Sequence, residues 1–116
     1  MLFSSSLKLN HVFRRLYRKG ATSANRYLAL YCRSNGTEQN RLGLTVSAKL
    51  GHAVRRNRVR RRLREIYRLH EPEFRRGWEL VIVVRQRAMD ASYQELEQAV
   101  LSLAQRLELL HPEEVR

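Results

Sequence analysis

The chain has 116 residues and a formal net charge of +12, from 23 Lys and Arg against 11 Asp and Glu. This length predicts one domain over residues 1–116, large enough to bury a core without metal or disulfide staples. The excess of cations indicates a polyanionic partner, and nucleic acid is favoured over an anionic membrane surface. The single Cys32 excludes an internal disulfide and favours a reducing compartment.

Several function classes lack the residues they need. The five glycines are scattered, and the four histidines show no metal-ligand spacing, so each histidine is expected in a loop or on the surface. No nucleophile stands beside a base, and Glu71 and Glu73 are expected to be solvated loop charges rather than a catalytic pair. We predict no catalytic residue and no metal ligand. Residues 80–84, the longest apolar run, are too few to span a membrane, which favours a cytoplasmic protein without a membrane partner.

The first predicted element is a short helix that begins at Leu9 and ends near Gly20. Its apolar residues recur with helical spacing, at Leu9, Val12, Phe13, Leu16 and Tyr17. Core packing is the simpler role for Phe13 and Tyr17. The sharper hypothesis places both rings beside a basic groove, where they stack on bases.

Two strands are predicted next, at residues 26–33 and 41–47, because apolar and polar residues alternate in both segments. Residues 34–37 supply turn chemistry between them, so we predict an antiparallel hairpin. Cys32 is expected to be buried in the first strand. The outward residues of the second strand are Arg41, Gly43, Thr45 and Ser47. This small, polar set leaves one face of the sheet open for a ligand or another chain.

Residues 49–68 form the most basic stretch, with nine cations and one acid, Glu65, and so supply +8 of the +12 net charge. A helix is predicted at residues 53–69. Helical spacing places Val59, Leu63 and Ile66 on one stripe. The opposite stripe holds Asn57, Arg61, Arg64 and Arg68. The helix is therefore expected to have a core face and a cationic face.

A central strand and a final helix complete the predicted elements. Residues 78–85 contain five consecutive apolar residues rich in β-branched types, which is typical of a strand covered on both faces. Ser92 and Glu95 form a capping-box pattern at the start of the last helix. That helix is expected to reach Pro112, with Leu96, Val100, Leu103, Leu107 and Leu110 facing the core.

Arginine rather than lysine carries the charge of the central helix. A guanidinium binds phosphate bidentately and stacks on bases, whereas lysine acts as a point charge. A solvated helix face is the simpler explanation, but such faces interleave glutamates with their cations, and here Glu65 alone offsets eight arginines. The surrounding pattern shows no helix-turn-helix or zipper, so DNA is not the predicted partner. Structured RNA suits an α+β domain with one basic helix.

Residues 42–65 resemble the signature of the bacterial ribonuclease P protein component. The hallmark is the run Arg56-Asn57-Arg58, which follows a Lys-x-Gly-x-Ala-Val sequence that starts at Lys49. Residues 13–20 resemble the first helix of the family, Tyr31 matches its aromatic strand position, and residues 81–85 match its apolar strand. Ala48 departs from the pattern, since many members have a second lysine there. Arg87 stands where some members have proline.

The resemblance implies an α+β fold, with one sheet of about four strands packed by helices in the order α-β-β-(β)-α-β-α. It also implies a left-handed βαβ crossover through the basic helix, against the ordinary right-handed rule. In function, it implies the protein subunit of an endoribonuclease whose catalytic RNA removes the 5′ leader of precursor tRNA with Mg²⁺. The protein then binds both the ribonuclease P RNA and the leader, and the RNA holds most of the Mg²⁺.

This reading assigns two binding surfaces. The residues expected to contact the catalytic RNA are Lys49, Arg56, Asn57, Arg58, Arg60, Arg61, Arg64 and Arg68. The residues expected to line a leader-binding cleft are Phe13, Tyr17 and Tyr31. The alternative is a general structured-RNA-binding protein of ribosomal or chaperone type, without a role in tRNA processing. A protein-only nuclease would need a carboxylate cluster, which the sequence does not contain.

Overall fold

The computed structural model describes residues 1–7 and 20–111. The predicted first helix, with Phe13 and Tyr17, lies outside the described residues, as does Pro112. The described chain forms one mixed sheet with two α-helices, which confirms the predicted α+β class. The sheet has five strands rather than about four: β1 Ser4–Ser6, β2 Ala21–Ala24, β3 Leu28–Ser34, β4 Asn40–Thr45 and β5 Trp78–Val84.

The order of the strands is β1-β4-β5-β3-β2, so the predicted hairpin of neighbouring strands is wrong. β5 lies between β3 and β4, antiparallel to the first and parallel to the second. Ile82 is level with Leu30 on one side and Leu44 on the other. The alternation of apolar and polar residues predicted which side chains are buried. It carried no information on which strands are neighbours in the sheet. The apolar run of β5 needs cover on both faces, and the centre of the sheet provides it.

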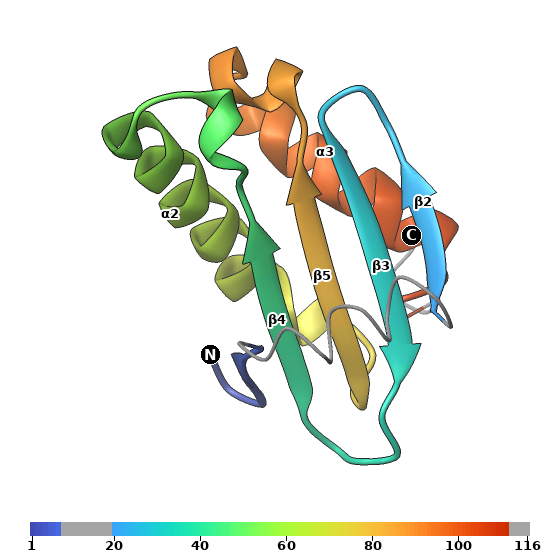
Figure 1. The fold of residues 1–116 in the computed structure, drawn as a ribbon. Coiled ribbons are helices and arrows are strands. Elements are labelled where there is room, and N and C mark those ends of the chain that lie inside the picture. Colours follow the sequence, from blue (N-terminus) through green and yellow to red (C-terminus); the bar gives the residue numbers. More distant parts are fainter. Residues whose placement is uncertain (8–19, 112–116) are drawn as a thin grey trace.

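Both α-helices cover the same face of the sheet (Figure 1). They are α2, Ala53–His70, and α3, Tyr93–Arg106, and three short 3₁₀ helices lie at Ala48–Leu50 (η1), Glu71–Glu73 (η2) and Gln86–Asp90 (η3). The capping box of α3 is confirmed, since the Glu95 N–H donates to Ser92 Oγ over 3.1 Å and the Ser92 N–H donates to Glu95 Oε1 over 2.9 Å.

α3 ends at Arg106, earlier than predicted. The chain turns there because Glu108 adopts a left-handed φ of 57° and Leu109 is fully buried. Leu110 then forms a β-bridge with Phe74, and the His111 N–H donates to the Glu73 carbonyl over 2.9 Å. The residues after α3 therefore pair with the segment after α2 and do not form the last helical turns that the sequence predicted.

The connection from β4 through α2 to β5 is left-handed, as the family resemblance implied. β4 and β5 are parallel. In Figure 1 both point upward, α2 lies behind the sheet, and β5 lies to the right of β4. A right-handed crossover would place β5 on the other side of β4.

The main core fills the space between the helices and the sheet. Its α2 members include Val59, Leu63 and Ile66, all at most 3% exposed, as the helical spacing predicted. Burying each such side chain contributes roughly 1.5 to 3 kcal/mol, so this stripe fixes how α2 is rotated on the sheet. Cys32 is also buried, as expected, and burial raises the pKa of its thiol to about 11.

Glu71 is not the solvated loop charge that the sequence suggested. It is 1% exposed, and its carboxylate accepts hydrogen bonds from the N–H groups of Leu2 and Phe3. His70 is likewise held rather than free. Its ring nitrogens lie 2.6 Å from Glu73 Oε2 and 2.7 Å from Glu97 Oε2. Leu2, Phe3 and Glu97 lie far away in the sequence, so their contacts with Glu71 and His70 could not be read from it, whereas Glu73 lies only three residues after His70.

Candidate RNA-binding surface

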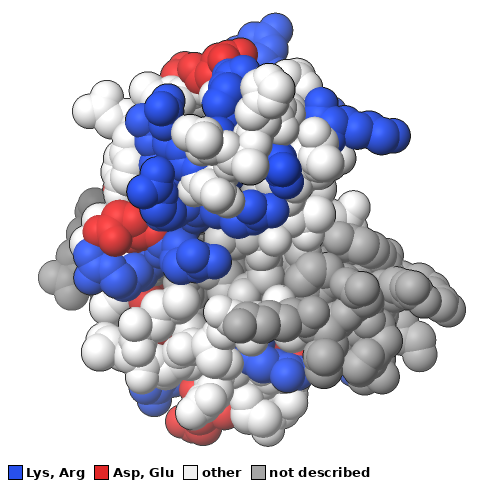
Figure 2. All heavy atoms as spheres, turned by 60° about the vertical axis from the view of Figure 1, so that its left-hand side comes forward, with Lys and Arg blue, Asp and Glu red and all other residues white. Residues whose placement is uncertain are grey.

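The rotation of α2 presents one continuous cationic face. We call the predicted contact residues Lys49, Arg56, Asn57, Arg58, Arg60, Arg61, Arg64 and Arg68 the arginine face. All are exposed except Arg56 and Arg60, which are half-buried. Figure 2 shows Lys and Arg side chains gathered over the part of the surface that α2 contributes.

Few acids neutralise this face. Arg68 pairs with Glu65 one turn earlier, its Nε lying 3.1 Å from Glu65 Oε2. The hydrogen bond from Arg68 lowers the pKa of Glu65. Within the described part of the chain, Arg61 and Arg64 make no ion pair. Their charges are available to an external anion.

A shallow hollow lies on the arginine face, lined by Val54, Asn57, Arg60, Arg61 and Arg64. Arg60 Nη1 donates to Asn57 Oδ1 over 2.9 Å. This bond holds one guanidinium against the helix surface and leaves the Asn57 amide N–H groups as further donors. The hollow therefore offers hydrogen-bond donors and positive charge, which suits phosphate groups.

Three arginines of α2 also have structural roles. Arg56 Nε donates to the Gly51 carbonyl over 3.1 Å, which ties the start of α2 to the preceding turn. Arg55 pairs with Asp90, and Arg62 Nη1 donates to the Ala91 carbonyl over 3.3 Å. The last two side chains join α2 to the segment before α3.

The second face of the sheet, opposite the helices, carries Tyr31. Tyr31 is level with Val81 and packs with Leu7, Val81 and Val83 in a small second core. Val81 and Gly43 are buried, so the middle of this face is covered and the expectation of an open face is wrong there. Arg41 and Thr45 remain partly exposed at its margins. Of the three predicted cleft residues, the structure describes only Tyr31.

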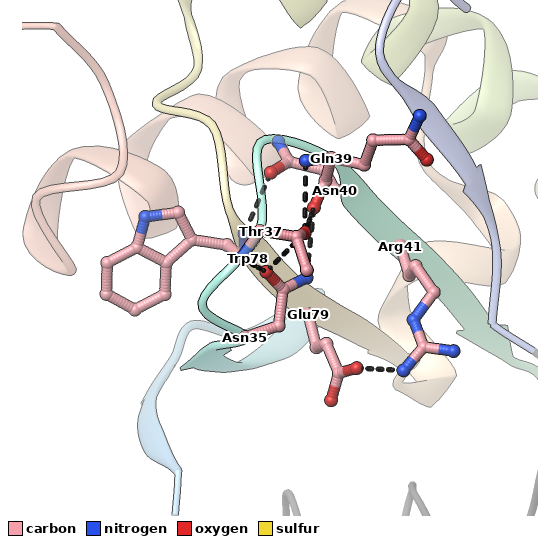
Figure 3. A network of polar contacts seen from close by, with 7 residues as sticks. All are labelled: Asn35, Thr37, Gln39, Asn40, Arg41, Trp78 and Glu79. Carbon is pink, nitrogen blue, oxygen red and sulfur yellow. Dashed lines mark hydrogen bonds and ion pairs between the residues drawn. The ribbon is translucent and has the colours of Figure 1, made fainter.

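A polar group at one end of this second face was missed in the sequence. It comprises Arg33, Arg41 and Glu79 on the strands and Asn35, Thr37 and Gln39 in the loop between β3 and β4. Figure 3 shows all of these residues except Arg33. The sequence identified the loop only as a turn. The sole signal was that Arg33 and Arg41 occupy outward strand positions, and the placement of β5 between them was needed to see the group.

An α+β fold with one sheet and a cationic helix face with few nearby acids defines a small RNA-binding protein. Residues 2–108 match the family model described as Ribonuclease P. The ribonuclease P protein component of Alkaliphilus oremlandii is 41% identical over 105 residues, covering 90% of this chain and 92% of that protein. That of Alkaliphilus metalliredigens is 38% identical and covers 95% of this chain and 99% of its own. The chain belongs to the ribonuclease P protein family.

Solved structures of the family share the fold. The Staphylococcus aureus RNase P protein superposes with a TM-score of 0.84 at 30% identity, covering 91% of this chain and 97% of that one. The RNase P protein from Thermotoga maritima gives 0.80 at 28% identity, with 87% and 96% covered. Family membership makes this chain the protein part of an endoribonuclease ribonucleoprotein in tRNA processing, with an RNA subunit as its partner. A ribosomal or chaperone-type role is not favoured.

Proposed function

We propose that this chain binds two RNA molecules at once, through surfaces on different layers of one domain. The arginine face binds the catalytic RNA, and the second sheet face binds the 5′ leader of precursor tRNA. The observation that carries this proposal is the position of Tyr31 on the sheet layer, away from the cationic side of α2. A protein built this way holds the substrate leader beside the RNA that cleaves it.

The arginine face suits a structured RNA because it offers positive charge in a row. α2 spans 18 residues, or about 27 Å at 1.5 Å per residue, long enough to follow several phosphates. Phosphate contacts of this kind position a protein without reading sequence. Lys49 extends the row beyond the start of α2, and its backbone N–H is fixed by the Ser47 hydroxyl over 3.2 Å.

The leader is proposed to lie along the second sheet face, with Tyr31, Phe13 and Tyr17 packing or stacking against single-stranded nucleotides. Stacking on an aromatic ring contributes about 1 to 3 kcal/mol per base and tolerates any base. The face would therefore bind a leader of any sequence. The side chain of Tyr31 is partly buried among apolar neighbours, which limits its rotamers and presents the ring in one orientation.

Mg²⁺ is proposed to act while bound mainly to the RNA. Among the described residues, no group of three or more His, Cys, Asp or Glu side chains could hold a metal ion. The described part of the protein therefore does not fit a site of its own, and we derive no catalytic step from it. Its contribution is to bind, orient and neutralise charge.

The proposed place of action is the cytoplasm. Within residues 1–7 and 20–111, no helix is long and apolar enough to cross a bilayer. We propose neither a membrane nor DNA as a partner.

A reconstitution assay tests the proposal. Precursor tRNA is cleaved by the catalytic RNA at limiting Mg²⁺, with and without this protein, using a long leader and a leader of one nucleotide. The expected result is tighter binding and faster cleavage of the long-leader substrate when the protein is present, and a smaller gain for the short one. Equal gains for both substrates would contradict leader binding, and cleavage without the RNA would indicate a protein-only nuclease.

A further inference from the structure

The second sheet face ends in a polar hollow beside the loop between β3 and β4 (Figure 3). Its floor is a row of three side chains from neighbouring strands. Register places Glu79 of β5 level with Arg33 of β3 on one side and with Arg41 of β4 on the other. All three therefore project from the same face of the sheet.

The charges in this row are unequally exposed. Glu79 pairs with Arg41, and the Glu79 side chain is 7% exposed while that of Arg41 is 41% exposed. Arg33 is partly exposed and makes no ion pair within the described residues. The row of Arg33, Glu79 and Arg41 carries a net charge of +1. Its acid, Glu79, is the most buried of the three, so an anion that enters the hollow meets the arginines first.

The loop that forms the wall is fixed before any ligand arrives. Asn35 Oδ1 accepts from the Thr37 N–H over 2.9 Å and from Thr37 Oγ1 over 2.7 Å, while Asn35 Nδ2 donates to the Gln39 carbonyl over 2.9 Å. Gly77 lies against this loop at Thr37 and has a φ of +92°. A Cβ atom there would lie 2.4 Å from the Thr37 carbonyl oxygen. Because these bonds already order the loop, a ligand that binds there loses little affinity to the conformational entropy of the loop.

We propose that this hollow binds a phosphodiester of single-stranded RNA. It would be a second binding site for the substrate leader, which contacts nucleotides further along the leader than those at Tyr31. This inference rests on the proposed function. Tyr31 and Arg33 are two positions apart on β3 and so lie on the same face, about 6.6 Å from each other along the strand. A chain that contacts the ring of Tyr31 continues directly onto Arg33.

The net charge of the row suits a diester. A phosphodiester carries one negative charge, which the row neutralises, whereas a phosphate monoester carries nearly two and would leave one uncompensated beside Glu79. Glu79 Oε2 is engaged by Arg41, and no described hydrogen bond uses Oε1. A ribose 2′-hydroxyl or a base amino group of the same nucleotide supplies a donor for that oxygen.

The hollow lies at the far end of the substrate path. In Figure 1 the loop between β3 and β4 is at the opposite end of the sheet from η1 and the start of α2. Lys49 and the Arg56-Asn57-Arg58 run belong to that other end. The leader thus enters at the end beside the catalytic RNA and reaches Arg33 only if it is long enough.

The test uses the full-length protein assembled with catalytic RNA, and measures the affinity for precursor tRNA with leaders lengthened one nucleotide at a time. Arg33→Gln is expected to weaken binding about tenfold, as for removal of a charge-assisted hydrogen bond, but only above a threshold leader length. Its salt dependence should fall by about 0.7 in log–log slope, the value for one single-strand phosphate contact. Arg33→Lys should restore part of the affinity.

Two other variants separate the possible failures. Arg106→Gln removes the same charge from α3, on the other layer, and should leave every leader unaffected. Tyr31→Ala should weaken binding at shorter leader lengths than Arg33→Gln does. If Tyr31→Ala has an effect and Arg33→Gln behaves like Arg106→Gln at every length, the hollow is not a leader site. If Tyr31→Ala has no effect, the proposed function itself fails. Weaker assembly of Arg33→Gln with the catalytic RNA alone would assign the hollow to that RNA and overturn the inference.

Discussion

The backbone N–H of Phe3 donates to the Glu71 carboxylate over 3.1 Å, across 68 positions of sequence. Leu2 donates to the same carboxylate, and the hydroxyl of Ser4 lies 2.7 Å from that of Tyr67, near the end of α2. The edge strand β1 is thereby attached to the segment that ends the cationic helix. The helix cannot shift along the sheet without breaking these bonds.

Glu71→Gln is expected to destabilise the protein by about 1 to 3 kcal/mol, because a buried charged acceptor of backbone N–H groups is removed. Burial raises the pKa of Glu71, but hydrogen bonds from Ser4, Leu2 and Phe3 outweigh it and lower the pKa below the usual value. The stabilisation is therefore present above the unfolded-state pKa of about 4.5 and is lost as the pH falls through the lower folded-state pKa. Denaturant unfolding at a series of pH values should show the two proteins converging in acid. A constant difference would contradict this account.

His70→Gln is expected to cost about 1 kcal/mol below pH 6.5 and less above it. Burial lowers the pKa of His70, but hydrogen bonds to Glu97 and Glu73 outweigh it and raise the pKa. A raised folded-state pKa gives stabilisation that is complete below the unfolded value and lost as the pH rises through the folded value. Unfolding midpoints of the two proteins across this range provide the measurement, with His52→Gln, an exposed histidine, as the control. A difference that grows with pH would refute a stabilising role for the two His70 hydrogen bonds.

Arg61→Ala combined with Arg64→Ala should weaken assembly with the catalytic RNA and reduce its salt dependence. Removing one phosphate contact lowers the log–log slope by about 0.7 to 0.9. Both side chains are exposed, so the melting temperature should barely change. The matched control replaces Arg75 and Arg106, which lie outside the arginine face. An unchanged slope would remove Arg61 and Arg64 from the interface.

Tyr31→Ala should lower the affinity for precursor tRNA with a long leader by about tenfold or more, as expected when one stacking interaction is removed, and should leave the one-nucleotide leader unaffected. Phe13→Ala with Tyr17→Ala should act in the same direction. Tyr31→Phe keeps the ring and should keep most of the affinity. The comparison is made at limiting Mg²⁺, with and without the protein. Equal reductions for both leaders would point to misfolding instead, which a thermal melt would detect.

The sequence predicted those features that depend on local periodicity. The buried stripe of α2, its cationic face and the capping box of Ser92 all follow from spacing within one helix, and all are present. Tyr67 was missed as a core residue because its burial comes from interactions with Ser4 and Asn40, far away in sequence. β1 and β2 were missed because three serines and the run Ala-Thr-Ser-Ala show no apolar alternation. The strand order also needed information that alternation does not contain.

The same distinction holds for the candidate site: some of its features follow from local spacing, and others depend on how distant segments meet in the fold. Exposure of the arginine face follows from helical geometry, but the identity of the RNA came only from the family resemblance. The row of Arg33, Glu79 and Arg41 could not be predicted, because it exists only once β5 separates β3 from β4. A charge that was expected to be solvated, such as Glu71, is buried by segments that approach it from elsewhere in the chain.

The central place of β5 also determines when the protein completes its fold during synthesis. β3 and β4 leave the ribosome before β5 and have no shared neighbour until residues 78–84 appear. Until then each presents a free edge, and the eight arginines of α2 are already available to nearby RNA. Completion of the sheet is a late, non-local step and should be slow compared with formation of α2. The nascent chain is therefore most prone to mispairing in the interval between α2 and β5.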